Sequence, residues 1–345
     1  MQYRLIGRSG LHASRVILGT WATGGFQWGG TEEQESIRAI HAALDEGINA
    51  IDTAPIYGFG ESEIRVGKAV SDRRDKVLLA TKCGLVWHTD QGKFLYTADD
   101  QGITQDGSGR KVFCYLHPLS VRYEIERSLK RLNTEYIDLY QIHAMDETTP
   151  IPDILELMQA LKQEGKIRAF GVCNASVEHL EQYHVTGYLD SDQERYSLFD
   201  REVEKKNVRY CEDHGVAFIA YSALFHGLLT GKTTPDEHYQ PGDFRRTRQR
   251  FTPAYIVKVN QMLSMVNPIA GDRQASISQI VLAYMLRQPG CTHVLAGARK
   301  VAHASENARA GGLELSDKEL QFLHEIFRNH LPGLPAQNPS AEMRE

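Results

Sequence analysis

The most constraining feature of the sequence is an alternation of short apolar runs with longer amphipathic stretches. The runs have the length and composition of strands, and the stretches between them carry apolar residues at helical spacing. The eight predicted strands are Val16–Gly19, Asn49–Asp52, Val77–Lys82, Tyr136–His143, Ile167–Asn174, Leu189–Gln193, Gly215–Tyr221 and Thr292–Gly297. The predicted helices are Glu32–Glu46, Glu61–Ala69, Ser120–Leu132, Pro152–Glu164, Val177–Val185, Glu202–His214, Pro253–Val266, Ser276–Leu286 and Val301–Ala310.

Alternating strands and helices predict a parallel sheet. Because the runs are continuously apolar, both faces of this sheet are expected to be buried. Eight such units in roughly 250 residues match a (β/α)8 barrel. We therefore predict an α/β fold, a (β/α)8 TIM barrel with an N-terminal β-hairpin, and the alternative is an open doubly wound sheet. No linker, repeat or charge block divides the chain, so residues 1–331 are predicted to form one domain, followed by a loosely ordered tail at 332–345.

Two insertions interrupt the alternation and are predicted as long loops. Val86–His117 follows the third strand, and Leu224–Phe251 follows the seventh. Long loops in compact domains are usually lids or binding loops. Loops that follow barrel strands lie on the face that carries the chemistry, so both insertions are expected to shape a substrate pocket.

Charge and composition restrict the classes of partner. Lys and Arg number 39 and Asp and Glu 44, for a formal net charge of −5. Proteins that bind nucleic acid or membrane surfaces normally carry a basic excess, so neither partner is expected. No apolar run reaches the ~20 residues of a membrane span, and the start lacks the layout of a signal peptide. The five cysteines and 14 histidines lack disulfide or metal spacing, which predicts a cytoplasmic protein without a metal.

Polar residues stand at the ends of seven consecutive predicted strands. They are Asp52, Lys82, His143, Asn174, Gln193, Tyr221 and the Gly-Ala-Arg segment 297–299. In a barrel these strand ends open at one face, where barrel enzymes place their catalytic groups. A single polar strand end can simply be solvated, but the whole series predicts a shared site.

Asp52, Tyr57, Lys82 and His143 form the candidate catalytic set. A phenol has an unperturbed pKa of about 10. We expect the Lys82 ammonium to lower the pKa of Tyr57, and Asp52 to orient that ammonium. Such a set suits the donation of a proton to a carbonyl oxygen, or its removal from an alcohol. A purely structural ion pair between Asp52 and Lys82 is the alternative.

Several motifs also carry a family resemblance. They read DTAPIYGFGESE, ATKCG, IDLYQIH, GVCNAS, YSLFDR, AYSALFHGLLTGK and AGARKVAHASEN. In their order and strand context they resemble the aldo-keto reductase superfamily, in its bacterial branch, from about Leu5 to Leu323. The resemblance implies a barrel that reduces an aldehyde or ketone, or oxidises an alcohol, with NADPH or NADH.

The resemblance also implies a role for each site residue. Tyr57 matches the general acid/base, Lys82 and Asp52 the groups that tune its pKa, and His143 the residue that orients the substrate. Asn174 and Gln193 match the residues that bind the nicotinamide carboxamide, and Tyr221 the ring that stacks on the nicotinamide. The implied cofactor-binding positions are Gly19, Thr20, Trp21, Asp52, Asn174, Gln193, Tyr221, Ser222, Leu224, Gly227, Leu229, Lys232, Gly297, Arg299, His303, Glu306 and Asn307.

The expected cofactor is NADP(H), with NAD(H) less favoured. Arg299 and Lys300 lie beside the segment that matches the adenosine site, and a 2′-phosphate prefers a bidentate guanidinium partner. Cys173, Ala223 and His303 replace the family's usual Ser, Pro and Gln, which affects the fine cofactor geometry but not the reaction. A monomer is the state that the resemblance implies, and an oligomer is the alternative.

Two other functions are considered. A Schiff-base aldolase would use Lys82 as its nucleophile, but it has no use for Asp52 and Tyr57 together. A non-catalytic, cofactor-sensing barrel subunit is the second alternative, and the intact catalytic set with His143 argues against it.

Overall fold

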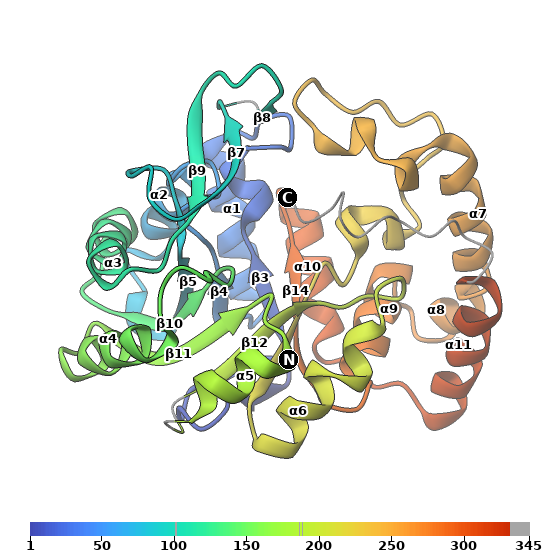
Figure 1. Ribbon diagram of the computed structural model, residues 1–345. Helices are drawn as coiled ribbons and strands as arrows, with labels where there is room; N and C mark the ends of the chain where they lie inside the picture. Colours follow the sequence, from blue (N-terminus) through green and yellow to red (C-terminus); the bar gives the residue numbers. More distant parts are fainter. Residues whose placement is uncertain (101, 186, 188, 332–345) are drawn as a thin grey trace.

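Eight parallel strands close into a barrel in the computed structural model, which describes residues 1–331 except 101, 186 and 188 (Figure 1). In order around the barrel they are β3 (Val16–Gly19), β4 (Ala50–Asp52), β5 (Leu78–Cys83), β10 (Ile137–Ile142), β11 (Ile167–Cys173), β12 (Leu189–Arg195), β13 (Ala217–Tyr221) and β14 (Cys291–Gly297). β14 pairs with β3 and closes the ring. Every predicted barrel strand is present, so the predicted fold class is confirmed.

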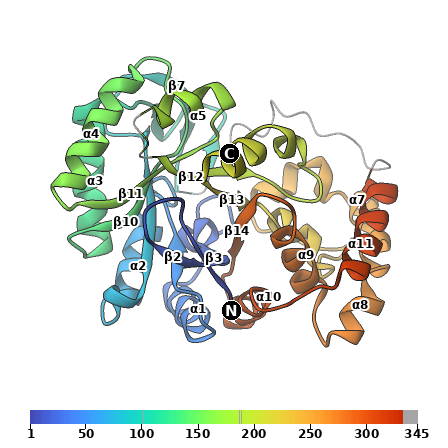
Figure 2. The same ribbon diagram turned by 90° about the horizontal axis from the view of Figure 1, so that it is seen from below.

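A short antiparallel hairpin covers one end of the barrel, as predicted. Its strands are β1 (Tyr3–Leu5) and β2 (His12–Ser14), and Figure 2 shows this dark blue segment from below. Ile6 and Leu11 pack with the small interior residues of the barrel strands. The turn passes so close to Asp190 that a Cβ on Gly7, which has a φ of +53°, would lie 2.2 Å from the Asp190 carbonyl oxygen. Only glycine fits this approach.

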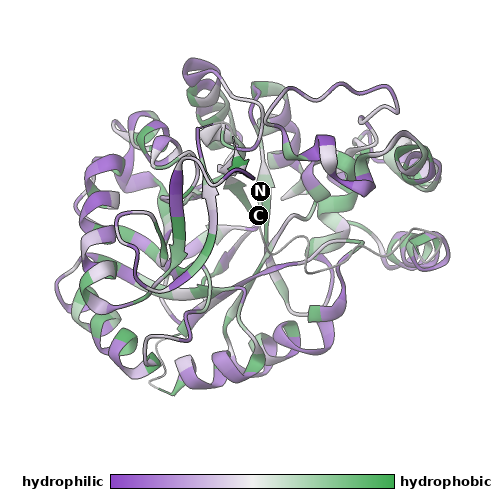
Figure 3. Ribbon diagram, turned by 45° about the horizontal axis from the view of Figure 1, so that its top comes forward, coloured by the Kyte–Doolittle hydropathy of each residue, from purple (hydrophilic) through white to green (hydrophobic). Residues whose placement is uncertain are grey.

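Helices surround the barrel and turn their apolar faces toward it, while their outer faces are hydrophilic (Figure 3). They are α1 (Glu33–Asp45), α2 (Glu61–Val70), α3 (Pro118–Leu132), α4 (Ile151–Gln163), α5 (Val177–His184), α6 (Asn207–His214), α7 (Pro253–Ser264), α8 (Asn267–Asp272), α9 (Ile277–Leu286), α10 (Val301–Ala310) and α11 (Asp317–His330). Among the described residues, no helix has the length and apolarity needed to span a membrane.

Three features differ from the sequence prediction. The first insertion is not an irregular loop but a four-stranded antiparallel sheet in the order β6-β9-β7-β8. Its strands are β6 (Leu85–Val86), β7 (Lys93–Ala98), β8 (Ile103–Thr104) and β9 (Arg110–Cys114). The aromatic and β-branched residues of β7 and β9 favour strands, and Gly107 and Gly109 lie in the turn between β8 and β9.

The other two differences concern helices. The predicted helix Glu202–His214 begins as a separate 3-10 turn, Glu202–Lys205, because the backbone of Lys206 leaves the helical region before α6 starts. α8 and α11 were not predicted. α11 has a recognisable start, since Ser316 and Glu319 form a capping box. The prediction of one domain over residues 1–331 stays a prediction, and the predicted tail at 332–345 lies outside the described residues.

Candidate active site

The polar strand ends meet at one mouth of the barrel, as the parallel sheet requires. Asp52 is the last residue of β4, and Lys82 lies near the end of β5. Tyr57 belongs to the loop after β4, and Gly24 of the loop after β3 presses against its backbone. A Cβ at position 24 would lie 2.5 Å from the Tyr57 carbonyl oxygen. The close packing of these two loops holds Tyr57 over the mouth.

The structure brings the four predicted catalytic residues together. Lys82 Nζ lies 2.5 Å from Asp52 Oδ1 and 3.4 Å from the Tyr57 hydroxyl. The Tyr57 and His143 rings pack edge to face with their centroids 5.7 Å apart. Lys82 also donates to the Thr53 carbonyl at 2.9 Å, so its ammonium has three acceptors. These contacts connect the carboxylate of Asp52, the ammonium of Lys82 and the phenol of Tyr57 in that order.

Burial and charge set the protonation states in this set. Burial alone would favour a neutral Lys82, but the Asp52 carboxylate and Tyr57 outweigh it and raise the pKa of Lys82. The pKa of His143 lies well below its usual range, because the ring is buried and faces the Lys82 ammonium. His143 is therefore a neutral imidazole at pH 7, able to share a hydrogen bond but carrying no charge.

Lys82 lowers the pKa of Tyr57, as expected, but its influence is smaller than an opposing one that was not predicted. Burial is the largest influence and raises the pKa of Tyr57 to about 12, although Lys82 pulls it downward. The half-buried phenol lies where a phenolate would lose part of its hydration, a cost that the sequence does not reveal. Tyr57 is therefore protonated at pH 7, and Lys82 limits rather than reverses the effect of burial.

The second oxygen of Asp52 is held by two amides. Gln141 Nε2 donates to Asp52 Oδ2 at 3.0 Å, and Gln193 Nε2 donates to the same oxygen at 2.9 Å. Gln193 Nε2 also donates to Gln141 Oε1 at 3.2 Å. Gln141 was missed by the sequence analysis. The signal is a polar residue two positions before His143 in an apolar strand, where alternation points both side chains inward.

The predicted nicotinamide residues form the next part of the mouth. Tyr221 donates its hydroxyl to Asn174 Oδ1 at 2.8 Å, and Asn174 Nδ2 donates to the His143 carbonyl at 2.9 Å. Asn174 is exposed and has a left-handed backbone with a φ of 56°. Its amide and the half-buried Tyr221 ring are thus fixed beside the catalytic set.

The loop after β13 has an unusual backbone. Ser222, Phe225, His226 and Gly227 all have positive φ angles, within the 3-10 segment Phe225–Thr230 or just before it. Such alternation of backbone conformation can direct successive N–H groups to one anion. The Leu229 side chain is fully buried in the core, and its backbone N–H donates to the Leu224 carbonyl, so this predicted cofactor residue has only its carbonyl to offer.

The loops after β3 and β13 are joined by aromatic rings. Trp21 stacks on Phe244 with centroids 5.3 Å apart and meets His226 edge to face at 5.6 Å. The Phe244 N–H donates to the Gln27 carbonyl. Thr20, another predicted cofactor residue, is buried and donates its hydroxyl to the Asp52 carbonyl. The first loop is therefore anchored both to β4 and to the loop after β13.

The predicted adenosine-binding residues gather around the start of α10. Arg299 donates to the Trp28 carbonyl at 3.0 Å, and its guanidinium lies 5.5 Å from the Trp28 ring centroid. Lys232 and Glu306 form an ion pair at 2.5 Å. The other members of this group are His303, which is exposed, and Asn307, whose amide donates to the carbonyl of the exposed Gly297 at 3.1 Å.

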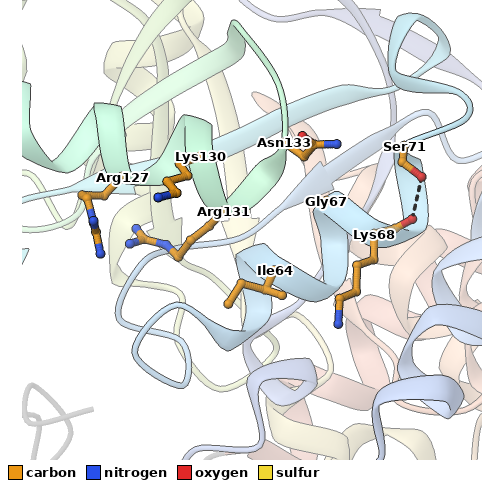
Figure 4. A pocket seen from close by; sticks show the side chains of 8 residues that line it. All are labelled: Ile64, Gly67, Lys68, Ser71, Arg127, Lys130, Arg131 and Asn133. Atoms are coloured by element: carbon orange, nitrogen blue, oxygen red, sulfur yellow. Dashed lines mark hydrogen bonds between the residues drawn. The ribbon is translucent and has the colours of Figure 1, made fainter.

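A separate hollow of about 590 Å³ lies on the outer surface between α2 and α3 (Figure 4). Its cations include Lys68, Arg127, Lys130 and Arg131. Three of these already have partners, since Lys68 pairs with Glu33, Arg131 pairs with Glu63, and the Arg127 guanidinium lies 6.0 Å from the Tyr123 ring centroid. The cations lie in the carboxyl-terminal halves of the two helices, where the helix dipole makes positive charge favourable. None of the predicted site residues lines this hollow.

Comparison with known proteins agrees with this geometry. Residues 15–328 match the sequence pattern described as the aldo/keto reductase family. Aldo-keto reductase YhdN of Bacillus subtilis (strain 168) is 38% identical, over 95% of this chain and 94% of that protein. The NADH-specific methylglyoxal reductase of Escherichia coli (strain K12) is 37% identical, over 93% of this chain and 97% of that protein. The solved structure of glycerol dehydrogenase AKR11B4 from Gluconobacter oxydans superposes with a TM-score of 0.82 at 37% identity, covering 98% of this chain and 97% of that one.

Proposed function

The chain belongs to the aldo/keto reductase family, and we propose that it reduces a small aldehyde or ketone to an alcohol with NADPH, using Tyr57 as the proton donor. The observation that carries this proposal is the hydrogen-bonded series of buried Asp52, buried Lys82 and half-buried Tyr57 at the barrel mouth. Reduction delivers a hydride to the carbonyl carbon and requires a proton at the oxygen. A protonated phenol beside a fixed ammonium meets that need.

The states of the individual groups support this direction of proton transfer. Because the pKa of Tyr57 is raised to about 12, its donor form is fully populated at pH 7. The Lys82 ammonium stabilises the phenolate that remains after the proton has left. The neutral His143 ring contacts Tyr57 and can hydrogen-bond the carbonyl oxygen, which would orient the substrate toward the phenol.

The residues around the mouth fit a nicotinamide cofactor, which supplies the hydride when bound. The Tyr221 ring offers a flat face, and the fixed amides of Asn174 and Gln193 offer partners for a carboxamide. The positive-φ segment at Ser222–Gly227 suits a pyrophosphate. Arg299 and Lys232 would lie along the adenosine half.

We assign NADP(H) as the preferred cofactor on the strength of Arg299. A guanidinium binds a 2′-phosphate through charge-assisted hydrogen bonds of roughly 1.5–3 kcal/mol each. Its side chain is held near Trp28 by a carbonyl and a ring contact, so its direction is already set. The name of the Escherichia coli relative specifies NADH, which makes this preference a separate question from the reaction itself.

For the substrate we propose a small carbonyl compound. The names of two relatives refer to methylglyoxal and glycerol, both three-carbon compounds. The apolar cluster formed by the loop after β4 and the inserted sheet, which includes Tyr57, Phe59 and Trp87, adds an aromatic wall beside the proton donor. An aromatic wall of this kind suits an uncharged substrate.

The aldolase alternative is disfavoured by the state of Lys82. A Schiff-base lysine must be a free amine, whereas the pKa of Lys82 is raised by Asp52 and its ammonium already has three acceptors. A non-catalytic role has no specific observation in its favour.

The test is to incubate the purified protein with NADPH and methylglyoxal and to follow the absorbance of the reduced cofactor. We expect a protein-dependent loss of absorbance that Tyr57→Phe abolishes. No loss with methylglyoxal, glyceraldehyde or an aromatic aldehyde, with either NADPH or NADH, would reject the proposal.

A further inference from the structure

Gln141 is a buried amide in β10 that connects two parts of the site. Its side chain is 0% exposed and points into the barrel, as do the side chains of Asp52 and Gln193. It donates to Asp52 Oδ2 and accepts from Gln193 Nε2. Gln193 donates to that same Asp52 oxygen, so three side chains from β4, β10 and β12 form a closed triangle.

This triangle fixes the orientation of the Gln193 amide. An amide nitrogen carries two hydrogens, and those of Gln193 are directed at Asp52 Oδ2 and Gln141 Oε1. If the amide turned over, its oxygen would face the Asp52 carboxylate, which repels it. Gln193 therefore has only its carbonyl oxygen left to offer a ligand at the mouth, as an acceptor.

The same triangle also acts on the proton donor. Asp52 uses its other oxygen for Lys82, and Lys82 contacts the Tyr57 hydroxyl. A change in the hydrogen bonds of Asp52 therefore alters the position and charge environment of the Lys82 ammonium, and through Lys82 those of the Tyr57 hydroxyl. The groups that face Tyr57 electrostatically are Asp52 from β4, Lys82 from β5 and Cys173 from β11, with the His143 ring packed against it after β10.

We propose that Gln141 is a positioning residue, which holds Asp52 and Gln193 in one network and so aligns the proton donor with the seat of the nicotinamide carboxamide. This inference rests on the proposed function for the roles of Asp52, Tyr57 and Gln193. Gln141 touches neither substrate nor cofactor in this account. It acts through its two partners.

Two variants test this role. Gln141→Leu keeps the approximate size of the side chain and removes both its donor and its acceptor. Gln141→Glu restores both, because a carboxyl buried beside the Asp52 carboxylate keeps its proton, donates it to Asp52 and accepts from Gln193 through its other oxygen. Leu139→Val is the matched control, because Leu139 also points into the barrel from β10 but packs only in the apolar interior cluster.

The first measurement is the affinity for NADPH, titrated by fluorescence without any substrate. Gln141→Leu should weaken it by about three- to tenfold, the effect of one lost hydrogen bond, because the Gln193 amide is then held by Asp52 alone. Gln141→Glu should stay within about twofold of the wild type, since its acceptor remains.

The second measurement is kcat for carbonyl reduction at pH 7 and saturating NADPH, expressed per NADPH-binding site. In Gln141→Leu one of the two amides that hold Asp52 Oδ2 is lost, so Lys82 and Tyr57 are aligned less well. We expect kcat per site to fall by about three- to tenfold in Gln141→Leu, the effect of one lost hydrogen bond, and to stay within about twofold of the wild type in Gln141→Glu. A merely structural role would lower the number of NADPH-binding sites without changing kcat per site.

The proposal is overturned if Gln141→Leu matches Leu139→Val in both the NADPH affinity and kcat per site. If Gln141→Leu does not fold, Gln141→Met takes its place in both measurements, and a Gln141→Met protein that matches Leu139→Val overturns the proposal. If the wild-type protein reduces no carbonyl, the proposed function fails, and the NADPH affinities alone still report whether Gln141 orients Gln193.

Discussion

At the scale of single residues, the proposed reaction relies on a proton donor, Tyr57, that its surroundings make a weaker acid. The pKa of Tyr57 is raised to about 12, so Tyr57 keeps its proton until a substrate oxygen draws it away. The nearby ammonium acts at that moment, when negative charge appears on the phenolate. Lys82 is thus better described as stabilising the product of proton transfer than as pre-ionising Tyr57.

Replacing Tyr57 with Phe should remove the donor and little else. The ring and its edge-to-face contact with His143 are kept, so folding and NADPH affinity should be nearly unchanged. Loss of a positioned general acid typically costs about 10²–10⁴ in rate. Steady-state kinetics and a fluorescence titration measure the two quantities. Retention of more than about a tenth of the wild-type activity would point to another proton source, such as His143 or water.

Replacing Lys82 with Met should damage both catalysis and stability. The carboxylate of Asp52 would remain buried without its counter-ion, a change that typically costs about 3–5 kcal/mol. The pKa of Tyr57 would rise further, because Lys82 is the group that lowers it. Chemical denaturation should show a clear loss of stability that Tyr57→Phe lacks. Equal stability of the two variants would mean that Asp52 takes up a proton or water instead.

Replacing Arg299 with Ala should weaken NADPH binding about tenfold or more and leave NADH binding nearly unchanged. The matched control is Arg309→Ala, which removes an exposed arginine of α10 that pairs with Glu46 instead. Fluorescence titration of both cofactors provides the comparison. Equal losses for NADPH and NADH would show that Arg299 supports the Trp28 loop rather than a 2′-phosphate.

The residues that the sequence predicted well are those at the ends of strands. Asp52, Lys82 and His143 can be placed from the barrel pattern alone, since strand direction decides which ends meet. The protonation state of Tyr57 could not be predicted in this way, because the burial of its side chain depends on how the inserted sheet and the loop after β3 pack around it. Gln141 was passed over because an amide within an apolar strand looks like an ordinary interior residue.

At the scale of elements, hydrophobic periodicity located the barrel strands and most helices but not the first insertion. β7 and β9 are partly exposed, so their side chains lack the continuous apolar character of the barrel strands. Their pairing with each other is antiparallel and long-range, which no local pattern reveals. The unpredicted α11 is the opposite case, because its sequence does contain a local signal. Ser316 and Glu319 form a capping box that marks the start of the helix.

The loop Leu224–Phe251 should become better protected from hydrogen exchange when NADPH is added. The start of this loop has the positive φ angles that are typical of anion-binding turns, while the Trp21–Phe244 stack already ties its far part to the loop after β3. We therefore expect the largest slowing at 222–232 and a smaller one around Phe244. The β7–β9 sheet serves as an internal control. Unchanged exchange at 222–232 would mean that this segment does not contact the cofactor.

At the scale of the whole molecule, buried ionisable groups should make stability depend on pH. Burial raises the pKa of Glu124, which accepts from the Gly84 N–H, to about 8, and that of Asp192 to about 7. Between the ordinary carboxyl pKa and these values, the folded chain keeps protons that the unfolded chain releases. Stability therefore falls as pH rises through that window.

Buried histidines act in the opposite direction at lower pH. Burial lowers the pKa of His293 to about 4, so between this value and its ordinary 6.5 the unfolded chain binds the extra proton and stability rises with pH. The two effects oppose each other below about pH 6.5. Above it only the buried acids remain, so the melting temperature of the cofactor-free protein should decline between about pH 6.5 and 8.

Glu124→Gln should flatten that decline. The amide keeps an acceptor for the Gly84 N–H but has no proton to lose, so the variant should be less sensitive to pH above about 6.5. Glu164→Gln is the matched control: the pKa of Glu164 is lowered to about 2 by Arg122 and Lys166, so this carboxyl is ionised in both states throughout the range. Melting curves from pH 6 to 9 measure the slopes. A Glu124→Gln slope as steep as that of Glu164→Gln would show that Glu124 is already ionised in the folded protein, and that water or Arg131 supports its charge.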